Sequence, residues 1–226
     1  MSLIHDNIVI VKSKIAEAAS RSGRRFEEVE LMAVTKTFSA EKVREVVDDG
    51  LLVLGENRVQ ELLAKRPLLP SSVRWHLIGH LQSNKVRKVL PVVEAIHSVD
   101  NVDIAADIDR IAAELGLFPK VYLEVNVAGE STKFGFDPLQ IEAALEKLMA
   151  MHRLEIQGLM CVPPYTDDEE GNRKHFVRLR ELRDHLEKMS GIKLPGLSMG
   201  MSGDYTVAVE EGATIVRVGS AIFGSR

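Results

Sequence analysis

The sequence predicts a single (β/α)8 barrel, the TIM-barrel fold, with one extra helix at its N-terminus. Eight short apolar segments of strand character alternate along the chain with segments of helical periodicity, which is typical of a parallel sheet covered by helices. The chain has 226 residues, a length that α/β barrels commonly use for one domain. We therefore expect residues 1–226 to form one domain. An open doubly wound sheet is less favoured, because no GxGxxG sequence follows the first predicted strand.

The first part of the chain begins with a helix and continues with four strands. Apolar residues at helical spacing predict an amphipathic helix over the first twenty residues, which we expect to pack across one end of the domain. Residues 31–36 are too few for a helix and predict a buried strand. Further strands are predicted at 51–54, 73–78 and 92–97. The helices between them are predicted at 39–50, 83–90 and 100–116, and Asp100 is the predicted N-cap of the third.

The second part of the chain continues the alternation. Strands are predicted at 120–127, 154–162, 196–200 and 214–218. Asp137 and Pro138 predict the N-cap and first turn of a helix that runs through Leu148. The acidic residues 167–170 predict the start of a long helix with a charged, solvated outer face, and residues 204–211 predict a short helix.

Composition narrows the functional classes. A net charge of -4 and a pI of about 6.0 provide no basic surface for nucleic acid. The single cysteine, Cys161, has no internal disulfide partner, and no Cys/His cluster has the spacing of metal ligands. No secretory segment or apolar run long enough for a membrane span is present. We therefore expect a cytoplasmic protein that binds neither nucleic acid nor membrane.

Lys36 closes the first predicted strand and has two interpretations. Taken alone, a lysine at a strand end most often leaves the core and directs its ammonium group to solvent. Alternatively, its amine lies at the mouth of an apolar pocket, where desolvation lowers the pKa and gives a nucleophile that can form a Schiff base with a carbonyl. Active sites of (β/α)8 barrels lie where the strands end, so the other strand ends decide between these interpretations.

The last two predicted strands are followed by segments that suit a phosphate group. Gly200, Gly203 and Gly219 allow backbone N–H groups to approach an anion, and the hydroxyls of Ser202 and Ser220 can donate to its oxygens. Such glycines often serve only to turn the chain. Because two such segments follow the last two strands, where barrels commonly bind phosphate, we interpret them as a phosphate cradle.

Arg217 lies inside an otherwise apolar strand and needs an acceptor. One interpretation is a structural ion pair with Glu124 or Asp204. The other is a contact with the ring nitrogen of a cofactor. A lysine nucleophile, a phosphate cradle and an inward cation on one barrel face together indicate a site for pyridoxal 5′-phosphate (PLP), with the Schiff base on Lys36.

Six segments of the sequence resemble one known family. They are AVTK (33–36), GENRVQE (55–61), WHLIGHLQSNK (75–85), LM (159–160), SMGMSGD (198–204) and VRVGSAIFG (216–224). In this order they are similar to the motifs of the pyridoxal phosphate homeostasis protein family, whose members are single-domain barrels related to the N-terminal half of alanine racemase. The one variation is Ser220, which stands where threonine is frequent and keeps the hydroxyl.

The resemblance implies both the site and the function. It implies that Lys36 holds PLP and that Arg217 faces the ring nitrogen. It further implies phosphate contacts from Ser202, Gly219 and Ser220, Asn57 near the ring, and Met199 or Met201 in the pocket wall. Members of the family are regarded as non-catalytic proteins of PLP (vitamin B6) and amino-acid homeostasis. We therefore expect PLP as the cofactor, a monomer, and apo forms of PLP-dependent enzymes as candidate partners.

Two enzyme classes compete with this expectation. A Schiff-base aldolase would share the lysine and the phosphate cradle but would give Arg217 no ring to face. An amino-acid racemase needs a base on each face of the reacting carbon, and alanine racemase takes the second, a tyrosine, from a separate β domain. This sequence ends at Arg226, just after the predicted barrel, and its tyrosines are Tyr122, Tyr165 and Tyr205. Tyr165 and Tyr205 remain candidates for that role because both lie in or near predicted loops.

Overall fold

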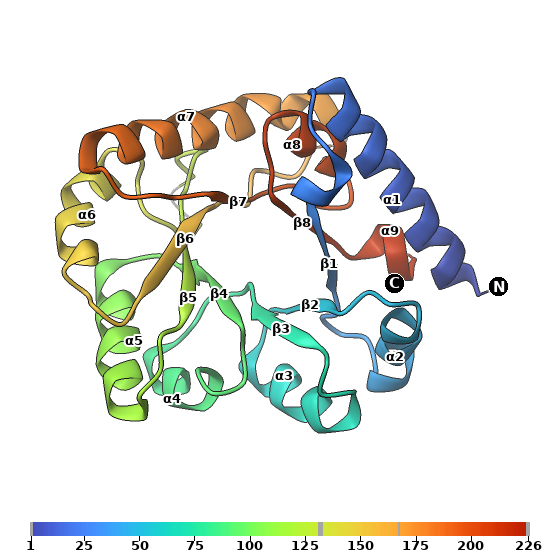
Figure 1. Ribbon diagram of the computed structural model, residues 1–226, viewed down its shortest axis with the longest axis horizontal. Helices are drawn as coiled ribbons and strands as arrows, with labels where there is room; N and C mark the ends of the chain where they lie inside the picture. Colours follow the sequence, from blue (N-terminus) through green and yellow to red (C-terminus); the bar gives the residue numbers. More distant parts are fainter. Residues whose placement is uncertain (1, 131–132, 167, 225–226) are drawn as a thin grey trace.

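The protein forms a closed barrel of eight parallel strands in chain order, described by a computed structural model for residues 2–130, 133–166 and 168–224 (Figure 1). The strands are β1 (Glu30–Val34), β2 (Val53–Glu56), β3 (Arg74–Leu77), β4 (Ala95–Val99), β5 (Lys120–Glu124), β6 (Glu155–Met160), β7 (Gly196–Ser198) and β8 (Ile215–Val218). The ring closes where β1 pairs with β8, with Glu30 opposite Ile215 and Ala33 opposite Val218. The predicted fold class is confirmed, and the closed ring excludes an open sheet.

Helices surround the barrel and bury the apolar faces that predicted them. They are α1 (Leu3–Arg21), α2 (Ala40–Asp48), α3 (Val59–Lys65), α4 (Val86–Val89), α5 (Val102–Leu115), α6 (Gln140–Met149), α7 (Arg173–Ser190), α8 (Tyr205–Glu210) and α9 (Ser220–Phe223). The extra helix α1 starts after Ser2, whose side chain accepts a hydrogen bond from the His5 N–H. It lies in the outer ring against α8 and α9, and not across one end of the barrel as predicted (Figure 1).

Several predicted boundaries were wrong for local reasons. Asn101, not Asp100, caps α5, because its side chain accepts from the Ile104 N–H at 2.9 Å, whereas the Asp100 carboxylate contacts His80. Helix α6 starts at Gln140, because the Asp137 side chain holds the Leu139 N–H and closes a turn before it.

The elements around the predicted strand ends also differ. Strand β5 ends at Glu124, because the Glu124 carbonyl accepts from Phe136 of the following loop. Helix α7 starts at Arg173, after a 3-10 turn (Glu169–Asn172), and Asp167 of the predicted acidic start lies outside the described residues. Helix α3 and the single turn α9 were not predicted, since each is too short to show clear periodicity.

The barrel wall separates two cores. The larger core lies between the strands and the helices and is apolar. The smaller cluster inside the barrel has one residue from each of six strands: Met32, Val53, Ala95, Tyr122, Met160 and Ile215. The buried polar residues His76, His97, Ser198 and Arg217 lie on β3, β4, β7 and β8. The inside of the barrel therefore carries a group of buried polar residues beside its apolar cluster.

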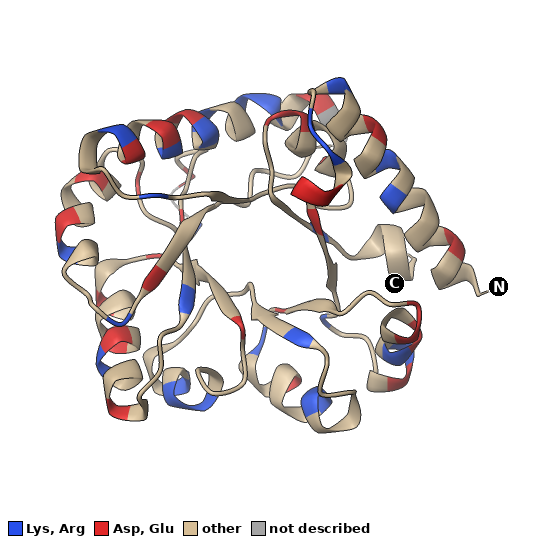
Figure 2. Ribbon diagram, viewed as in Figure 1, with Lys and Arg blue, Asp and Glu red and all other residues tan. Residues whose placement is uncertain are grey.

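Charged residues lie mainly on the outer helices. Figure 2 shows Lys and Arg interspersed with Asp and Glu along α1, α5 and α7. On α7, Arg173 pairs with Glu170, Glu210 and Glu211, so the positive charge at the start of this helix is compensated within the protein. In the described part of the chain, no helix has the length and apolar character that a membrane span requires.

Candidate functional site

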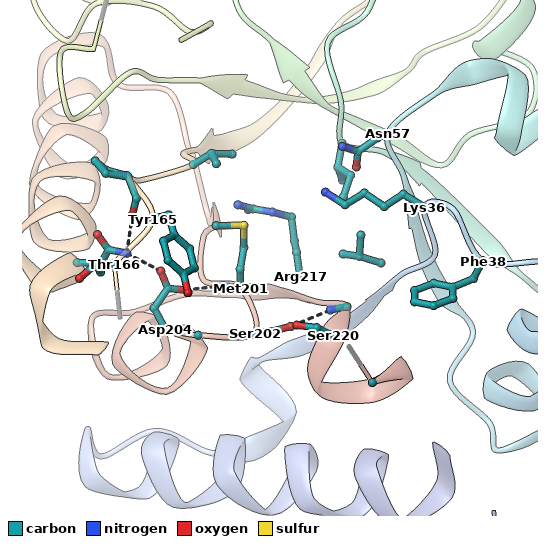
Figure 3. Close-up of a pocket in the computed structure, with 18 residues that line it drawn as sticks. Lys36, Phe38, Asn57, Tyr165, Thr166, Met201, Ser202, Asp204, Arg217 and Ser220 are labelled. Carbon is teal, nitrogen blue, oxygen red and sulfur yellow. Dashed lines mark hydrogen bonds between the residues drawn. The ribbon is translucent and has the colours of Figure 1, made fainter. Parts of the chain in front are cut away.

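A cavity of about 580 Å³ opens at the end of the barrel where the strands finish. Its lining comes from the segments after β1, β2, β3, β6, β7 and β8. Figure 3 shows side chains from these segments pointing into one space. The volume lies in the range of about 300–1,000 Å³ that small-molecule sites have. This is the end of the barrel at which the sequence predicted the site.

Lys36 reaches the cavity from the end of β1. The residue before it, Thr35, is fully buried, and Lys36 itself is half-buried. Figure 3 shows its side chain beside Asn57, with the amine directed toward the interior where Arg217 lies. The structure therefore favours the pocket interpretation of Lys36 over the solvent-directed one.

Arg217 forms the floor of the cavity from β8, and only 3% of its surface is exposed. Its Nη1 donates to Ser198 Oγ at 2.8 Å, and its Nη2 donates to the Cys161 carbonyl at 2.8 Å. Burial lowers the pKa of the guanidinium, but arginine keeps its proton in proteins. Among the described residues no carboxylate lies within ion-pair distance of Arg217, so the alternative of a structural pair with Glu124 or Asp204 was wrong. The cation is held by neutral acceptors.

A buried chain of hydrogen bonds continues from Arg217 across the barrel. Ser198 Oγ lies 2.8 Å from His97 Nδ1, and His97 Nε2 lies 2.8 Å from His76 Nδ1. Burial lowers the pKa of His76 to about 4 and the pKa of His97 well below its ordinary value. Both rings are therefore neutral near pH 7, and they fix Ser198 and Arg217 without adding charge.

The cradle predicted after β7 and β8 forms around Ser202. The Ser202 Oγ accepts the Gly219 N–H at 3.1 Å and the Ala221 N–H at 3.2 Å, which joins the two segments. Ser202, Gly219 and Ser220 all line the cavity. The described residues provide no acceptor for the Ser202 hydroxyl proton, so this proton can be donated to a ligand.

Glycine is required at one position of this cradle. Gly200 has a φ of +92°, and a Cβ there would lie 2.6 Å from the Ala208 Cβ. A larger residue would push the 200–204 loop away from α8, which follows it. Asp204 stabilises the same loop, because its carboxylate accepts the Met201 N–H at 2.6 Å and the Asn172 side-chain amide at 2.8 Å.

Comparisons with known proteins agree with this geometry. Residues 10–226 match the family described as "Alanine racemase, N-terminal domain". A pyridoxal phosphate homeostasis protein of Aquifex aeolicus is 43% identical over 96% of this chain and 95% of its own length. One of Pseudomonas aeruginosa is 42% identical over 100% and 97%. This chain belongs to the pyridoxal phosphate homeostasis protein family. The resemblance inferred from the motifs is confirmed.

One solved structure of a family member has the cofactor. PipY of Synechococcus elongatus, described with PLP bound, is 40% identical to this chain and superposes with a TM-score of 0.83. The superposition covers 93% of this chain and 100% of PipY. The structural similarity to PipY therefore extends over nearly the whole chain.

In the present chain, not every residue at a strand end reaches the cavity. Met201 lines it, but Met199 is fully buried in the outer core, so the expectation that Met199 could form the pocket wall was wrong. The two residues are two positions apart, so a continued strand would place both side chains on one face. Strand β7 ends at Ser198, however, and the positive φ of Gly200 turns the chain between them. Asn126 closes its own loop on Glu130, and His80 borders a separate, smaller cavity beside Asn57.

The three tyrosines differ in position. Tyr122 lies inside the barrel, where it stacks on His97, and burial raises its pKa to about 12. Tyr205 is 5% exposed and belongs to the outer core. Tyr165 lines the cavity and is 90% exposed. Of the two loop tyrosines considered for an acid–base role, only Tyr165 borders the site.

Sequence reasoning missed several residues of the site. The lining also includes Phe38, Thr166, Asn172 and Asp204. Asn172 is 4% exposed and bonds both Asp204 and the Pro164 carbonyl, yet it lies in a 3-10 turn far from any strand end. No spacing in the sequence indicates this role.

Sequence reasoning also missed the contacts that hold α9 in place. The Asn7 amide donates to the Ile222 carbonyl at 2.9 Å, and Lys42 Nζ donates to the Phe223 carbonyl at 3.1 Å. Phe38 stacks on Phe223 with ring centroids 4.3 Å apart. Helices α1 and α2 therefore hold the C-terminal end of α9, whose N-terminal end forms the cradle.

Proposed function

We propose that this chain binds PLP in the cavity and acts in PLP and amino-acid homeostasis without catalytic turnover. The observation that carries the proposal is the convergence of a lysine amine, a buried arginine and a hydroxyl-containing cradle in one cavity. The family membership supports the same conclusion. We further propose that residues 1–226 form one PLP-binding domain.

The residues present fit the chemical groups of PLP. Lys36 would hold the aldehyde carbon, and Arg217 would face the ring nitrogen. Ser202, Gly219 and Ser220 would hold the phosphate, because all three line the cavity and the Ser202 hydroxyl, which accepts two N–H groups, keeps its proton for a ligand. Asn57 would lie beside the ring, and Met201 would form part of the wall. When bound, PLP supplies an electrophilic aldehyde conjugated to an electron-withdrawing ring.

The arginine explains why this site is suited to holding PLP. Arg217 keeps its proton, so it can donate to a ring nitrogen but cannot leave a proton there. A ring nitrogen without a proton withdraws electrons less strongly. Arginine alone does not separate this site from alanine racemase, which has the same arrangement.

A racemase is the second candidate function, and one observation favours it. Tyr165 borders the cavity and carries a phenol that could serve as a second acid–base group. Tyr165 is 90% exposed, whereas a racemase would need to hold this group against one face of the substrate. An aldolase is less favoured, because it would leave Arg217 without a role.

Mapping of the attachment site tests the proposed binding. Protein purified without added cofactor should absorb in the visible range, and borohydride reduction should fix the cofactor on the peptide that contains Lys36. The Lys36→Ala variant should carry no fixed cofactor. A label on Lys85 or Lys133 in place of Lys36 would contradict the assignment.

A turnover assay tests the absence of catalysis. The PLP-loaded protein is incubated with a panel of L-amino acids, and enantiomers and keto acids are followed by chiral chromatography. We expect spectral changes at most. Turnover of about 1 s⁻¹ or faster, abolished by Lys36→Ala, would replace the homeostasis function by an enzymatic one.

We also propose a cytoplasmic monomer whose partners, beyond PLP, are apo forms of PLP-dependent enzymes. The buried, unpaired thiol of Cys161 suits a reducing compartment. Sedimentation with and without a PLP-dependent apoenzyme tests both the monomer and the partner.

A further inference from the structure

The two peptide groups that flank the Lys36 Cα are both held by side chains of α3. The carbonyl of the peptide between residues 35 and 36 belongs to Thr35, and the N–H of the peptide between residues 36 and 37 belongs to Thr37. Lys65 Nζ donates to the Thr35 carbonyl at 2.7 Å. Glu61 Oε2 accepts the Thr37 N–H at 2.9 Å. The two peptides determine the direction in which the Lys36 side chain leaves the backbone.

The Lys65 contact is buried and charged. Lys65 is 8% exposed, and its Nζ also lies 2.5 Å from Glu56 Oε1. The same Glu56 oxygen accepts the Thr35 hydroxyl at 2.7 Å, so Thr35 is held through its carbonyl and its side chain. Glu56 is fully buried, and its Oε2 has no partner in the described part of the chain. Burying these charged groups carries a desolvation penalty, which the contacts among Lys65, Glu56 and Thr35 must offset.

The Glu61 contact stabilises an unusual backbone conformation. Thr37 has a φ of +68° and is the one non-glycine residue with positive φ in the described ranges. A β-branched residue in this region costs on the order of 1–3 kcal/mol and persists only where surrounding contacts enforce it. The hydrogen bond from the Thr37 N–H to Glu61 is such a contact, and it lies directly after Lys36.

The two side chains act from one helix face. Glu61 and Lys65 are four residues apart in α3, and their charged groups lie 3.7 Å apart. Arg58, at the start of the same helix, lies 3.9 Å from Glu61. The cluster therefore contains two carboxylates and two cations, and it sits behind the backbone of Lys36.

We propose that Glu61 and Lys65 are positioning residues for the amine of Lys36. By fixing the peptide groups on both sides of residue 36, they direct the side chain into the cavity. The inference rests on the proposed function, in which Lys36 is the attachment point of PLP.

The first test separates attachment from pocket binding with two ligands. PLP has an aldehyde that can bond to Lys36, whereas pyridoxine 5′-phosphate has an alcohol in its place and reports only the ring and phosphate contacts. The ratio of the two dissociation constants therefore measures the contribution of the amine. In Glu61→Ala and Lys65→Met we expect this preference for PLP to fall about tenfold or more, while binding of pyridoxine 5′-phosphate changes less than twofold.

Matched variants sharpen this test. Glu61→Gln keeps an oxygen for the Thr37 N–H and should stay within about threefold of the parent protein. Glu146→Ala and Lys147→Met, on the exposed face of α6, remove the same charges elsewhere and should change neither constant. Equal weakening of both ligands would show general damage and would overturn the inference. Equal losses in Glu61→Gln and Glu61→Ala would also overturn it, because charge and not the backbone contact would then be responsible.

The second test needs no cofactor. In the ligand-free protein, hydrogen–deuterium exchange at the Thr37 amide should be at least about tenfold faster in Glu61→Ala than in the parent protein and the Glu146→Ala control. Unchanged exchange would overturn the inference even if Lys65→Met fails to fold. If Lys36→Ala keeps the full preference for PLP over pyridoxine 5′-phosphate, the proposed function fails. Faster exchange at the Thr37 amide in Glu61→Ala would even then establish the backbone contact.

Discussion

The two ends of the barrel handle charge differently. At the end where the strands begin, charged side chains neutralise one another: Arg74 contacts Glu30 and lies 3.6 Å from Glu94, and Lys120 lies 3.5 Å from the same carboxylate. At the end where the strands finish, Arg217 borders a cavity and is held by neutral acceptors. The charges of the first end pair with one another, whereas Arg217 at the second end is a cation without an ion pair among the described residues and lines a cavity.

This difference shows where a substitution affects function. The side chain of Arg74 is 43% exposed, and pairs of this kind contribute roughly 0–1 kcal/mol each. Arg217 is buried, so bulk water cannot take over its hydrogen bonds to Ser198 and the Cys161 carbonyl when the side chain is removed. Substitution of each of the two arginines therefore tests whether the two ends of the barrel differ in their effect on ligand binding.

The largest expected effect comes from Arg217. We expect Arg217→Met to weaken PLP binding about hundredfold or more, because the floor of the site loses its cation and leaves Ser198 and the Cys161 carbonyl without a donor. Arg217→Lys keeps the charge and should fall between this variant and the parent. Arg74→Met should bind PLP within about twofold of the parent. A titration followed by absorbance measures all three, and equal losses at the two ends would contradict the comparison.

The next effect concerns the pH dependence of stability near each end. The pKa of His76 is about 4 in the folded chain and about 6.5 in the unfolded chain. Acidification from pH 7 to pH 5 therefore protonates His76 mainly in the unfolded state, which lowers the free energy of unfolding by about 2 kcal/mol. We expect His76→Gln to remove this loss. Urea unfolding at the two pH values measures it, and an unchanged pH slope would show that His76 is not buried as a neutral ring.

Glu124 should change the slope in the opposite direction. Burial, reinforced by the negative charge of Asp100, raises its pKa to about 7 from an ordinary 4.5. Between pH 7 and pH 5 the folded state therefore takes up more protons than the unfolded state, which raises the free energy of unfolding by about 2 kcal/mol. Glu124→Gln should lose this gain and become less stable than the parent on acidification. The same urea series measures it, and a slope that changes in the same direction as in His76→Gln would contradict the assignment.

A smaller effect is expected at the cradle. Ser202→Ala removes the hydroxyl that joins the two cradle segments and should weaken PLP binding about tenfold while the fold persists. Ser190→Ala, in the last turn of α7, removes a hydroxyl far from the cavity and serves as the control. Unchanged affinity in Ser202→Ala would place the phosphate elsewhere.

The smallest effect comes from the support behind the cradle. Asn7→Ala deletes the hydrogen bond to the Ile222 carbonyl and should weaken PLP binding only about threefold, because Lys42 still holds the end of α9. The double variant with Lys42→Met should lose more than the sum of the single changes in binding free energy, since each tether covers for the other. Strict additivity, measured by the same titration, would show that the two contacts act independently.

The amino-acid sequence by itself determined the fold class and most of the site. Apolar periodicity depends on neighbours in the chain, so the alternation of strands and helices could be predicted before any contact between distant segments was known. Lys36, Asn57, Ser202, Arg217, Gly219 and Ser220 were all predicted to belong to one site, and the structure brings them to one cavity. Strand ends of a parallel barrel lie at one face, so order along the chain was enough for this step.

Only the tertiary structure decided which neighbours support these residues. Met199 and Met201 are equivalent by position, yet the turn after β7 places one in the core and the other in the cavity. Thr37 has a positive φ, and its N–H donates to Glu61, which lies 24 residues later in the chain. The acceptors of Arg217 come from β7 and from the residue after β6, and they meet only once the ring of strands closes. Contacts of this kind depend on distances between segments far apart in the chain, and a linear pattern carries no information about them.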